Sequence, residues 1–371
     1  MNKLKRKLIL YTVLCLIFWL GYQNKIYASD QPGGMHPQRQ IDFVKAQIRN
    51  KKEPYFTAFK ALIIKADSGL LINQHAVEDF SIPGFYADKE GHRRTSLALQ
   101  VDCFSAYSCA LAYQLTGQAK YALKAIYFLN SWAATNKKYS QLDGSLVMSY
   151  SGTTMMMAAE LLKNNKSWKA KDQQQFIWWT KNVFRQAANS IRYRNNNSGD
   201  WSRFASLLAD VYLNDQEDFQ KNVEMIKNEL FKQIAPDGHM VEEVKRQGNG
   251  IWYTYFSLAP ISASFWVVYN QTSENLFSLE QNGTSLKKAL DYLLYHNQHP
   301  EEWTWFKKPV TGNKDTATGF WPANLLEALN GIYHSKDFDD FVAPYRPIVY
   351  PRHDYAWTYP TLFPLSLTQY R

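Results

Sequence analysis

The chain consists mainly of segments of about 10–20 residues in which apolar side chains recur with the period of a helix. The segment 97–115 ends at Gly117, and the segment 120–134 places Ala122, Ile126 and Trp132 on one side. Similar segments cover residues 153–162, 172–191, 201–213, 219–234, 259–269, 286–295 and 322–332. Alternating strand patterns are scarce, and no fixed-length repeat is visible. We therefore expect an all-α toroid, or incomplete barrel, of diverged antiparallel helix hairpins.

The C-terminal residues 342–364 differ from the rest because they carry five prolines among several aromatic side chains. Proline at this density prevents helix formation. We therefore expect an extended strap, rich in proline and aromatic residues, that crosses the helical body. No linker-like stretch separates this strap from the helices, so residues 29–371 are predicted to form a single domain.

The first 28 residues have the pattern of a secretory signal peptide. Basic residues at positions 3, 5, 6 and 7 precede an uncharged apolar run at 8–22, and small residues follow at 28 and 29. The run is shorter than the roughly 20 residues of a membrane-spanning helix. We therefore predict cleavage near Ala28, a periplasmic or secreted mature protein, and no stable insertion in a membrane.

The net charge of the chain depends on this segment. The full chain has 42 Lys and Arg against 33 Asp and Glu, a formal charge of +9. Residues 1–28 contain five of the basic residues and none of the acidic ones, so the mature chain would keep +4. A charge this small does not indicate nucleic acid as a partner. Any basic feature that matters for binding is expected to be local.

The two cysteines of the mature chain, Cys103 and Cys109, fall in one expected helix. Six helical residues separate them by about 9 Å, whereas a disulfide allows about 7 Å between Cα atoms. Both are therefore predicted to be free and buried. The sequence contains no CxxC or HExxH pattern, so we expect neither a metal nor a cofactor.

Three segments stand out from the apolar helices. Residues 194–201 are rich in Asn, residues 237–246 combine an Asp-Gly turn with several charges, and residues 253–260 are aromatic. Taken alone, the first could end one helix and cap the next, and the second could be a solvated surface hairpin. A polar turn followed by charged and aromatic residues would also suit the rim of a groove.

The order of these segments resembles the alginate lyase family of polysaccharide lyases. The family motif Asn-Asn-x-x-x-Trp is matched by Asn196, Asn197 and Trp201. The second motif is matched by Asp237, Gly238, Glu243, Arg246, Tyr253, Phe256, Leu258 and Pro260, with Ser257 in the place of an alanine. Upstream stretches at 129–133 and 149–162 are also similar, so the resemblance spans at least residues 97–270.

The resemblance implies an (α/α) toroid with a cleft, which cuts an anionic uronate polymer by β-elimination without a cofactor. The C5 proton of a uronate is acidic only when the adjacent carboxylate is neutralised, and the reaction also needs a base for C5 and an acid for O4. By position, Asn197 and Arg246 would neutralise the carboxylate. Tyr253 would move the protons as base, as acid or as both.

Further residues are candidates for contact with the substrate. They are Asn196, Ser198, Trp201, Tyr150, Glu243, Tyr255, His92 and Arg93. Ser198 stands where the family's alginate enzymes have a histidine; if Asn195 and Asn196 are instead the motif pair, Asn197 stands there, and the histidine is absent under either alignment. Among the histidines that could replace it we favour His92, because the adjacent Arg93 and Arg94 would suit a polyanion; each could also be purely structural. The other histidines considered are His239 and His353.

The chain has 12 Trp, 24 Tyr and 21 Phe, a surplus that allows two interpretations. Most of these rings are expected in the core of the helical body. A minority could stack on the apolar faces of sugars, and Trp252 lies close to the motifs. The aromatic and basic stretch 303–308 is a further candidate, although no motif connects it with the cleft.

We expect the substrate to be a polymer rich in mannuronate, with another uronan such as glucuronan as the alternative. A glycoside hydrolase on the same fold would need two carboxylates facing across the cleft, and Asp200 and Glu243 are the motif-linked pair. A non-catalytic polysaccharide-binding or export factor is a third hypothesis, which the Ser198 position favours slightly. We expect a monomer whose partner is an anionic polysaccharide.

Overall fold

The computed structural model describes residues 33–312, 321–349 and 356–369. All of them belong to one compact unit, Gln31–Arg371. The predicted signal peptide at residues 1–28 lies outside the described residues, as does His353. Across the described ranges, no helix is both long and apolar enough to cross a bilayer.

Helices make up most of the described chain, and the prediction of an all-α toroid is confirmed. The helices are α2 (Gln38–Arg49), α3 (Tyr55–Leu70), α4 (Lys89–Thr116), α5 (Ala119–Thr135), α6 (Gly144–Leu162), α7 (Ala170–Trp179), α8 (Arg185–Ile191), α9 (Asn197–Leu213), α10 (Gln216–Gln233), α11 (Gly250–Thr272), α12 (Leu286–Gln298), α13 (Ala323–Tyr333) and α14 (Lys336–Val342). Short strands form two ribbons: β1 (Asp79–Ser81) pairs in parallel with β2 (Lys138–Ser140), and β3 (Glu280–Gln281) pairs antiparallel with β4 (Thr284–Ser285).

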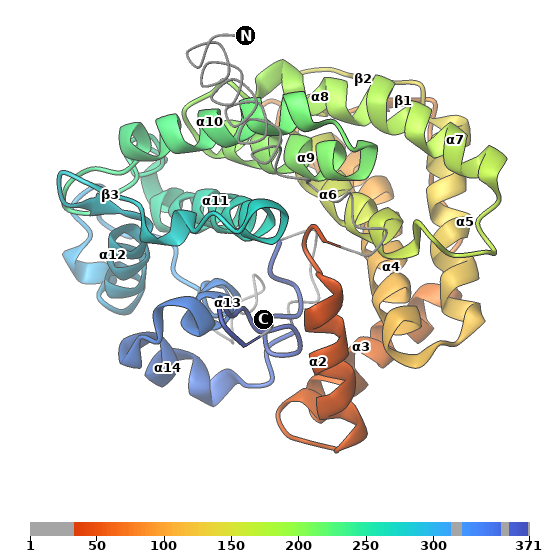
Figure 1. The fold of residues 1–371 in the computed structure, drawn as a ribbon. Coiled ribbons are helices and arrows are strands. Elements are labelled where there is room, and N and C mark those ends of the chain that lie inside the picture. The colour runs from red at the N-terminus through yellow and green to blue at the C-terminus, as the bar shows by residue number, and fades with distance from the viewer. Residues whose placement is uncertain (1–32, 313–320, 350–355, 370–371) are drawn as a thin grey trace, which may run out of the picture. The chain divides into compact units, whose positions relative to one another are not determined.

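Four helices with mostly buried side chains form the centre of the fold. Helix α4 packs against α6, α6 against α9, and α9 against α11. Each central contact is backed by neighbours in sequence: α3 and α5 lie on α4, α8 and α10 on α9, and α12 on α11. Figure 1 shows α4, α6, α9 and α11 following one another in chain order. The N-terminal halves of α9 and α11 carry residues of the family motifs, Asn197 and Trp201 on α9 and Tyr253 on α11.

Several helices begin earlier than their apolar periodicity indicated, and α4 and α11 are the clearest cases. Helix α4 begins at Lys89, where the Asp88 side chain accepts a hydrogen bond from the Gly91 N–H and so caps the first turn. Helix α11 begins at Gly250 and continues through Pro260, although proline usually interrupts a helix. Nearly every residue of α11 is buried, and this packing outweighs the lost backbone hydrogen bond. The aromatic segment therefore lies on a helix and not in a loop.

The described part of the predicted C-terminal strap packs on the helices. It has a single 3-10 turn at Ala343–Tyr345 and otherwise only turns and bends where it is described. The indole N–H of the buried Trp357 donates to the Ser262 hydroxyl of α11 at 3.0 Å. The Gln40 amide of α2 donates to the carbonyl of Pro364 at 2.9 Å. The strap thus ties the first helix to the central ones.

Cys103 and Cys109 are both buried, and neither forms a disulfide in the described chain, as predicted. Burial raises the pKa of the Cys109 thiol to about 12. A thiol in this state is a packing group and not a nucleophile.

Asn136, just after α5, anchors the loop that leads to the N-terminus of α4. Its buried amide donates to the carbonyls of Val77, Glu78 and Lys138 at 3.0–3.2 Å. Its carbonyl oxygen accepts the indole N–H of Trp179 at 2.9 Å. One side chain therefore satisfies four buried or partly buried backbone and side-chain groups.

Replacing Asn136 with alanine should lower the free energy of unfolding by about 2–4 kcal/mol, because the buried partners lose their hydrogen bonds. Urea unfolding followed by circular dichroism measures the change. The neighbouring Thr135 is exposed, and Thr135→Ala should change stability by less than about 0.5 kcal/mol. Equal effects of the two substitutions would contradict the anchoring role.

Candidate active site

The Asn-rich segment forms the N-terminus of α9. The Asn196 side chain caps this helix by accepting the Ser198 N–H at 3.0 Å, and Asn197 is the first helical residue. A Cβ atom on Gly199 would stand only 1.8 Å from the carbonyl oxygen of Arg194. Glycine therefore allows the preceding loop to lie directly against the helix.

A buried polar network around Arg203 fixes the N-terminus of α9 and the loop before it. The Arg203 guanidinium donates to the carbonyls of Arg192 and Arg194 at 2.7 and 3.1 Å, which secures the loop before Asn196. The same guanidinium pairs with the buried Asp200 carboxylate at 2.5 Å. These contacts fix the position of the loop relative to α9.

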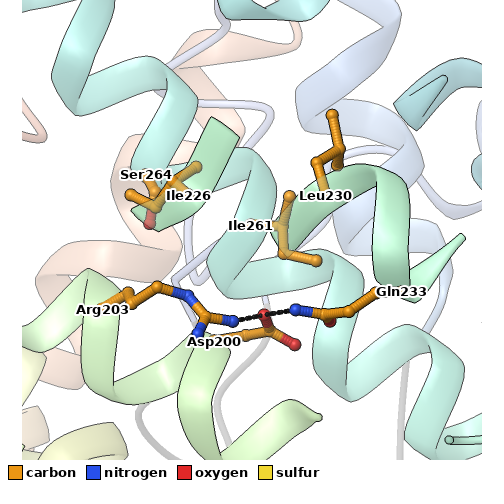
Figure 2. Close-up of a pocket in the computed structure, with 7 residues that line it drawn as sticks. All are labelled: Asp200, Arg203, Ile226, Leu230, Gln233, Ile261 and Ser264. Atoms are coloured by element: carbon orange, nitrogen blue, oxygen red, sulfur yellow. Dashed lines mark hydrogen bonds and ion pairs between the residues drawn. The ribbon is translucent and has the colours of Figure 1, made fainter. Parts of the chain in front are cut away.

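The Asp200 carboxylate also connects α9 with two other elements. It accepts the Gln233 amide at 3.0 Å and the hydroxyl of Ser257 on α11. Figure 2 shows Asp200 between Arg203 and Gln233 beside a small cavity. Burial raises the pKa of Asp200 although all these donors favour its ionised form. Asp200 is thus a structural junction with no access to solvent.

Glu243 holds Asn197 through two hydrogen bonds. The Asn197 N–H donates to Glu243 Oε1 at 2.6 Å, and the Asn197 side-chain amide donates to Oε2 at 2.8 Å. Glu243 is only 1% exposed, so it has no surface to offer a polymer. The prediction that Glu243 binds substrate is therefore corrected: it is a support for Asn197.

Burial raises the pKa of Glu243 to about 7, and the negative charge of Asp200 acts in the same direction. The hydrogen bonds from Asn197 and the charge of Arg246 oppose this shift. Both carboxylate oxygens accept N–H groups, which the ionised form does best. The protonation state of Glu243 therefore controls how firmly Asn197 is held.

Arg246 and Tyr253 lie beside this pair. The Arg246 Nε atom is 3.8 Å from Glu243 Oε2, and its guanidinium carbon lies 5.1 Å from the centre of the Tyr253 ring. Tyr253 is in the first turn of α11, and its hydroxyl is 3.2 Å from the hydroxyl of Tyr86. Contacts therefore run without a break from Asn197 through Glu243 and Arg246 to Tyr253 and Tyr86.

The Tyr253 phenol rests in its protonated form. Burial raises its pKa, the hydrogen bond with Tyr86 adds to this, and the charge of Arg246 opposes it. A neutral phenol is ready to donate a proton. Approach of Arg246 or loss of the Tyr86 hydrogen bond would make the same group easier to ionise.

Tyr86 is a site residue that the sequence analysis missed. It lies in the turn between β1 and α4, the residue is 66% exposed, and its ring packs edge-on against Phe85. The only signal in the sequence is a Phe-Tyr pair in a turn before a capped helix. Tyr86 and Tyr253 are far apart in the chain, so no local pattern connects them.

His92, in the first turn of α4, packs against the turn that carries Tyr86. Its ring packs edge-on against Phe85 with centroids 5.4 Å apart, and its Nε2 atom is 3.4 Å from Asp143. Burial lowers the pKa of His92, and Asp143 opposes the shift. Arg93 is exposed to solvent. The structure thus brings His92 near the aromatic edge of the site, while its predicted contact with substrate stays a prediction.

The predicted aromatic contacts divide into two kinds. Tyr150 is half-buried and packs edge-on against Trp201 and Phe256, so part of it remains accessible. Trp201 and Tyr255 are fully buried. Neither can present a ring face to a sugar, and we correct the prediction that they bind substrate: both are packing residues. Trp252 is half-buried and stacks on Phe256 at 4.7 Å.

Among the described residues, one group could offer metal ligands: His299, Glu301 and Glu302 have ligand atoms within 4.8 Å of one another. All three are exposed, and exposed acidic groups are common without an ion. This group contains no residue of the family motifs.

The Glu243 pKa predicts a specific dependence of stability on pH. Because the folded protein binds this proton more tightly than the unfolded chain, the resulting stabilisation is complete below the ordinary pKa of 4.5 and is lost as the pH rises to about 7. The glutamine of the Glu243→Gln variant does not titrate. The difference in the free energy of unfolding between wild type and variant should therefore decrease between pH 4.5 and pH 7, by at most about 3 kcal/mol.

Urea unfolding at pH 4.5, 6 and 8 measures this gap. Glu242→Gln is the matched control, because its exposed carboxylate pairs only with Lys245 on the surface. The control gap should stay constant with pH. A gap for Glu243→Gln that stays constant or widens toward pH 8 would contradict the raised pKa.

Comparison with known proteins supports the resemblance that the motifs suggested. A sequence profile of the alginate lyase family matches residues 65–303, which is more than half of the chain. No curated protein sequence matches the chain.

Solved structures with the same fold include several alginate lyases. An alginate lyase from Bacteroides ovatus is 19% identical with a TM-score of 0.69, over 88% of this chain and 99% of that one. Alginate lyase A1-III from Sphingomonas species A1 is 15% identical with a TM-score of 0.70, over 86% and 94%. A histidine-to-alanine variant of A1-III, complexed with a tetrasaccharide, is 16% identical with a TM-score of 0.66, over 78% and 86%.

At these identities the solved structures establish the fold, and the family profile establishes the relationship. The predicted relationship is confirmed: this chain belongs to the alginate lyase family of polysaccharide lyases.

Proposed function

We propose that this protein is an exported lyase that cleaves a polymer of mannuronate, or of the closely related glucuronate, by β-elimination. The observation that carries the proposal is the contact between Arg246 and Tyr253 next to an Asn197 that Glu243 holds in place. A cation and an anchored amide can neutralise the uronate carboxylate, and a tyrosine can move the protons that the elimination transfers.

Asn197 and Arg246 are suited to neutralise the substrate carboxylate. Glu243 takes one hydrogen of the Asn197 amide, which leaves the second hydrogen for a ligand. Asn197 is itself only 2% exposed, so this contact requires the surroundings of the helix end to open when the polymer binds. The Arg246 side chain is one-third exposed and lies 3.8 Å from its nearest carboxylate oxygen, so its contact with Glu243 is loose. A bound uronate carboxylate could therefore take hydrogen bonds from both residues.

Tyr253 is suited to move the protons. In both mannuronate and glucuronate, the C5 hydrogen and the C4 oxygen lie on the same side of the sugar ring. One phenol can therefore remove the first proton and deliver a proton to the second atom. In guluronate the two groups lie on opposite faces, so a single residue cannot serve both.

The resting Tyr253 is protonated, so it must ionise before it acts as a base. Arg246 lowers the cost of the phenolate, whereas the hydrogen bond with Tyr86 raises the pKa. A substrate that displaces Tyr86 would remove one of the effects that keep the phenol neutral. His92, whose lowered pKa leaves it neutral at pH 7, is the candidate to assist in place of the histidine that Ser198 replaces.

The glycoside hydrolase alternative conflicts with the burial of its two carboxylates. Asp200 and Glu243 are 2% and 1% exposed, and both are engaged by protein donors. A hydrolase needs an acid and a base that reach the glycosidic bond. The non-catalytic alternative differs from the lyase only in that it would bind the polymer without cleaving it, so an activity assay distinguishes the two.

We also propose that the protein acts outside the cytoplasm, as a monomer, after loss of residues 1–28.

The direct test is release of unsaturated sugar ends, which absorb in the ultraviolet. Tyr253→Phe should lower kcat by about 10²–10⁴-fold, because the proton-transfer group is lost. The control is Tyr113→Phe, which should leave activity unchanged. Tyr113 lies near the C-terminus of α4, whereas His92 and Tyr86 lie at and just before its N-terminus. Full activity of Tyr253→Phe would contradict the assignment.

Arg246→Ala should also reduce kcat/KM by at least about 100-fold, because the carboxylate loses its cation. Lys245→Ala is the matched control, since this neighbour is exposed and pairs with Glu242. The same assay on polymannuronate, polyguluronate, polyglucuronate and hyaluronan identifies the substrate. We expect cleavage of polymannuronate or polyglucuronate; cleavage of polyguluronate alone would contradict the role of a single tyrosine.

A further inference from the structure

Residues 303–312, which follow α12, lie directly against the turn between Arg246 and α11. The Val310 N–H donates to the carbonyl of Gly248 at 2.7 Å. A Cβ atom on Gly248 would meet the Phe306 ring at 3.3 Å, and one on Gly250 would meet Trp303 at 2.8 Å. The segment therefore continues the surface on which Arg246 lies.

This segment exposes large apolar side chains. Trp305, Phe306 and Val310 are 43%, 40% and 43% exposed. The Trp305 ring is nevertheless fixed: its indole N–H donates to the Tyr292 hydroxyl at 3.1 Å, and it packs on His239 with ring centroids 4.8 Å apart. Large apolar side chains exposed together in one segment are a feature of binding sites, and a ring held in place loses little entropy when a ligand stacks on it.

Two lysines complete the segment. Lys307 and Lys308 are both exposed, and neither pairs with a carboxylate in the part of the chain that the structure describes. The nearby His239 is instead engaged by Asp237 at 2.6 Å. The segment thus places two partly exposed rings next to two lysines that have no carboxylate partner among the described residues.

We propose that Trp305, Phe306, Lys307 and Lys308 form an accessory binding platform for the anionic polysaccharide, outside the residues that perform the elimination. A pyranose presents an apolar face of C–H groups that stacks on an aromatic ring, and a uronate adds a carboxylate at the edge of each sugar. Ring and ammonium groups together recognise both features. The continuity with Gly248 places the platform where a chain that occupies the Arg246 site can extend.

The proposal rests on the proposed substrate class, but binding can be measured without turnover. Native gels cast with polymannuronate should retard the full-length mature protein, and the same gels with a neutral cellulose ether should not. Trp305→Ala should weaken the apparent affinity by about tenfold, whereas Trp305→Tyr, which retains a ring, should keep most of it. The double variant Lys307→Ala/Lys308→Ala should weaken binding and reduce its dependence on salt.

Trp178→Ala is the matched control, since Trp178 is 47% exposed beside Lys137 but lies on α7. Its retardation should equal that of the wild type. No retardation of the wild type, or equal retardation of Trp305→Ala and Trp178→Ala, would overturn the platform. So would a change in oligomeric state of Trp305→Ala without a change in retardation, which would indicate a protein interface. Retardation that depends on Trp305 in a protein that releases no unsaturated ends would support the platform and contradict the lyase.

Discussion

The candidate site depends on the carboxylate of Glu243, which accepts both the backbone and the side-chain N–H groups of Asn197. Burying a carboxylate is unfavourable, and the raised pKa of about 7 reflects that cost. The two hydrogen bonds offset part of it, and they leave the amide with one direction in which to face a ligand. Asn197 can thus act as a fixed donor, which is what electrostatic stabilisation of a developing charge requires.

Buried contacts fix the position of α9, which carries Asn197, relative to α11, which carries Tyr253. On the α9 side, Arg203 and Asp200 hold the helix start and the loop before it. On the α11 side, Ser257 donates to the same Asp200 carboxylate, which ties the helix of Tyr253 to the helix of Asn197. The buried network in Figure 2 is therefore a brace behind the site and not a second centre.

The sequence predicted the helices well because their apolar periodicity is set by burial in the core, which is visible locally. Their ends were less predictable: α11 begins at Gly250, ahead of Pro260, because tertiary packing on both sides outweighs local propensity. The motif residue Trp201, and Tyr255 beside the second motif, are predicted to contact substrate, yet both are packing residues. A family motif records positions that the fold needs as well as positions that the chemistry needs, and a single sequence does not separate them.

Contacts between segments that are far apart in the chain could not be predicted from the sequence. Tyr86 reaches Tyr253 from a turn before α4, and Phe306 reaches Gly248 from beyond α12. Neither segment has a motif, so only the fold reveals that they border the same site. The aromatic stretch at 303–308 was visible in the sequence, but its relation to Arg246 depends on the hydrogen bond from Val310 to Gly248.

The measurement that tests the account most directly is a crystal structure of Tyr253→Phe with a mannuronate tetrasaccharide. We expect a uronate carboxylate within hydrogen-bonding distance of both the Asn197 amide and the Arg246 guanidinium, with C5 facing the ring at position 253. Glu243 should still accept both Asn197 groups in that complex. A sugar bound with its carboxylate turned away from Asn197 and Arg246, or bound on another face of the protein, would contradict it.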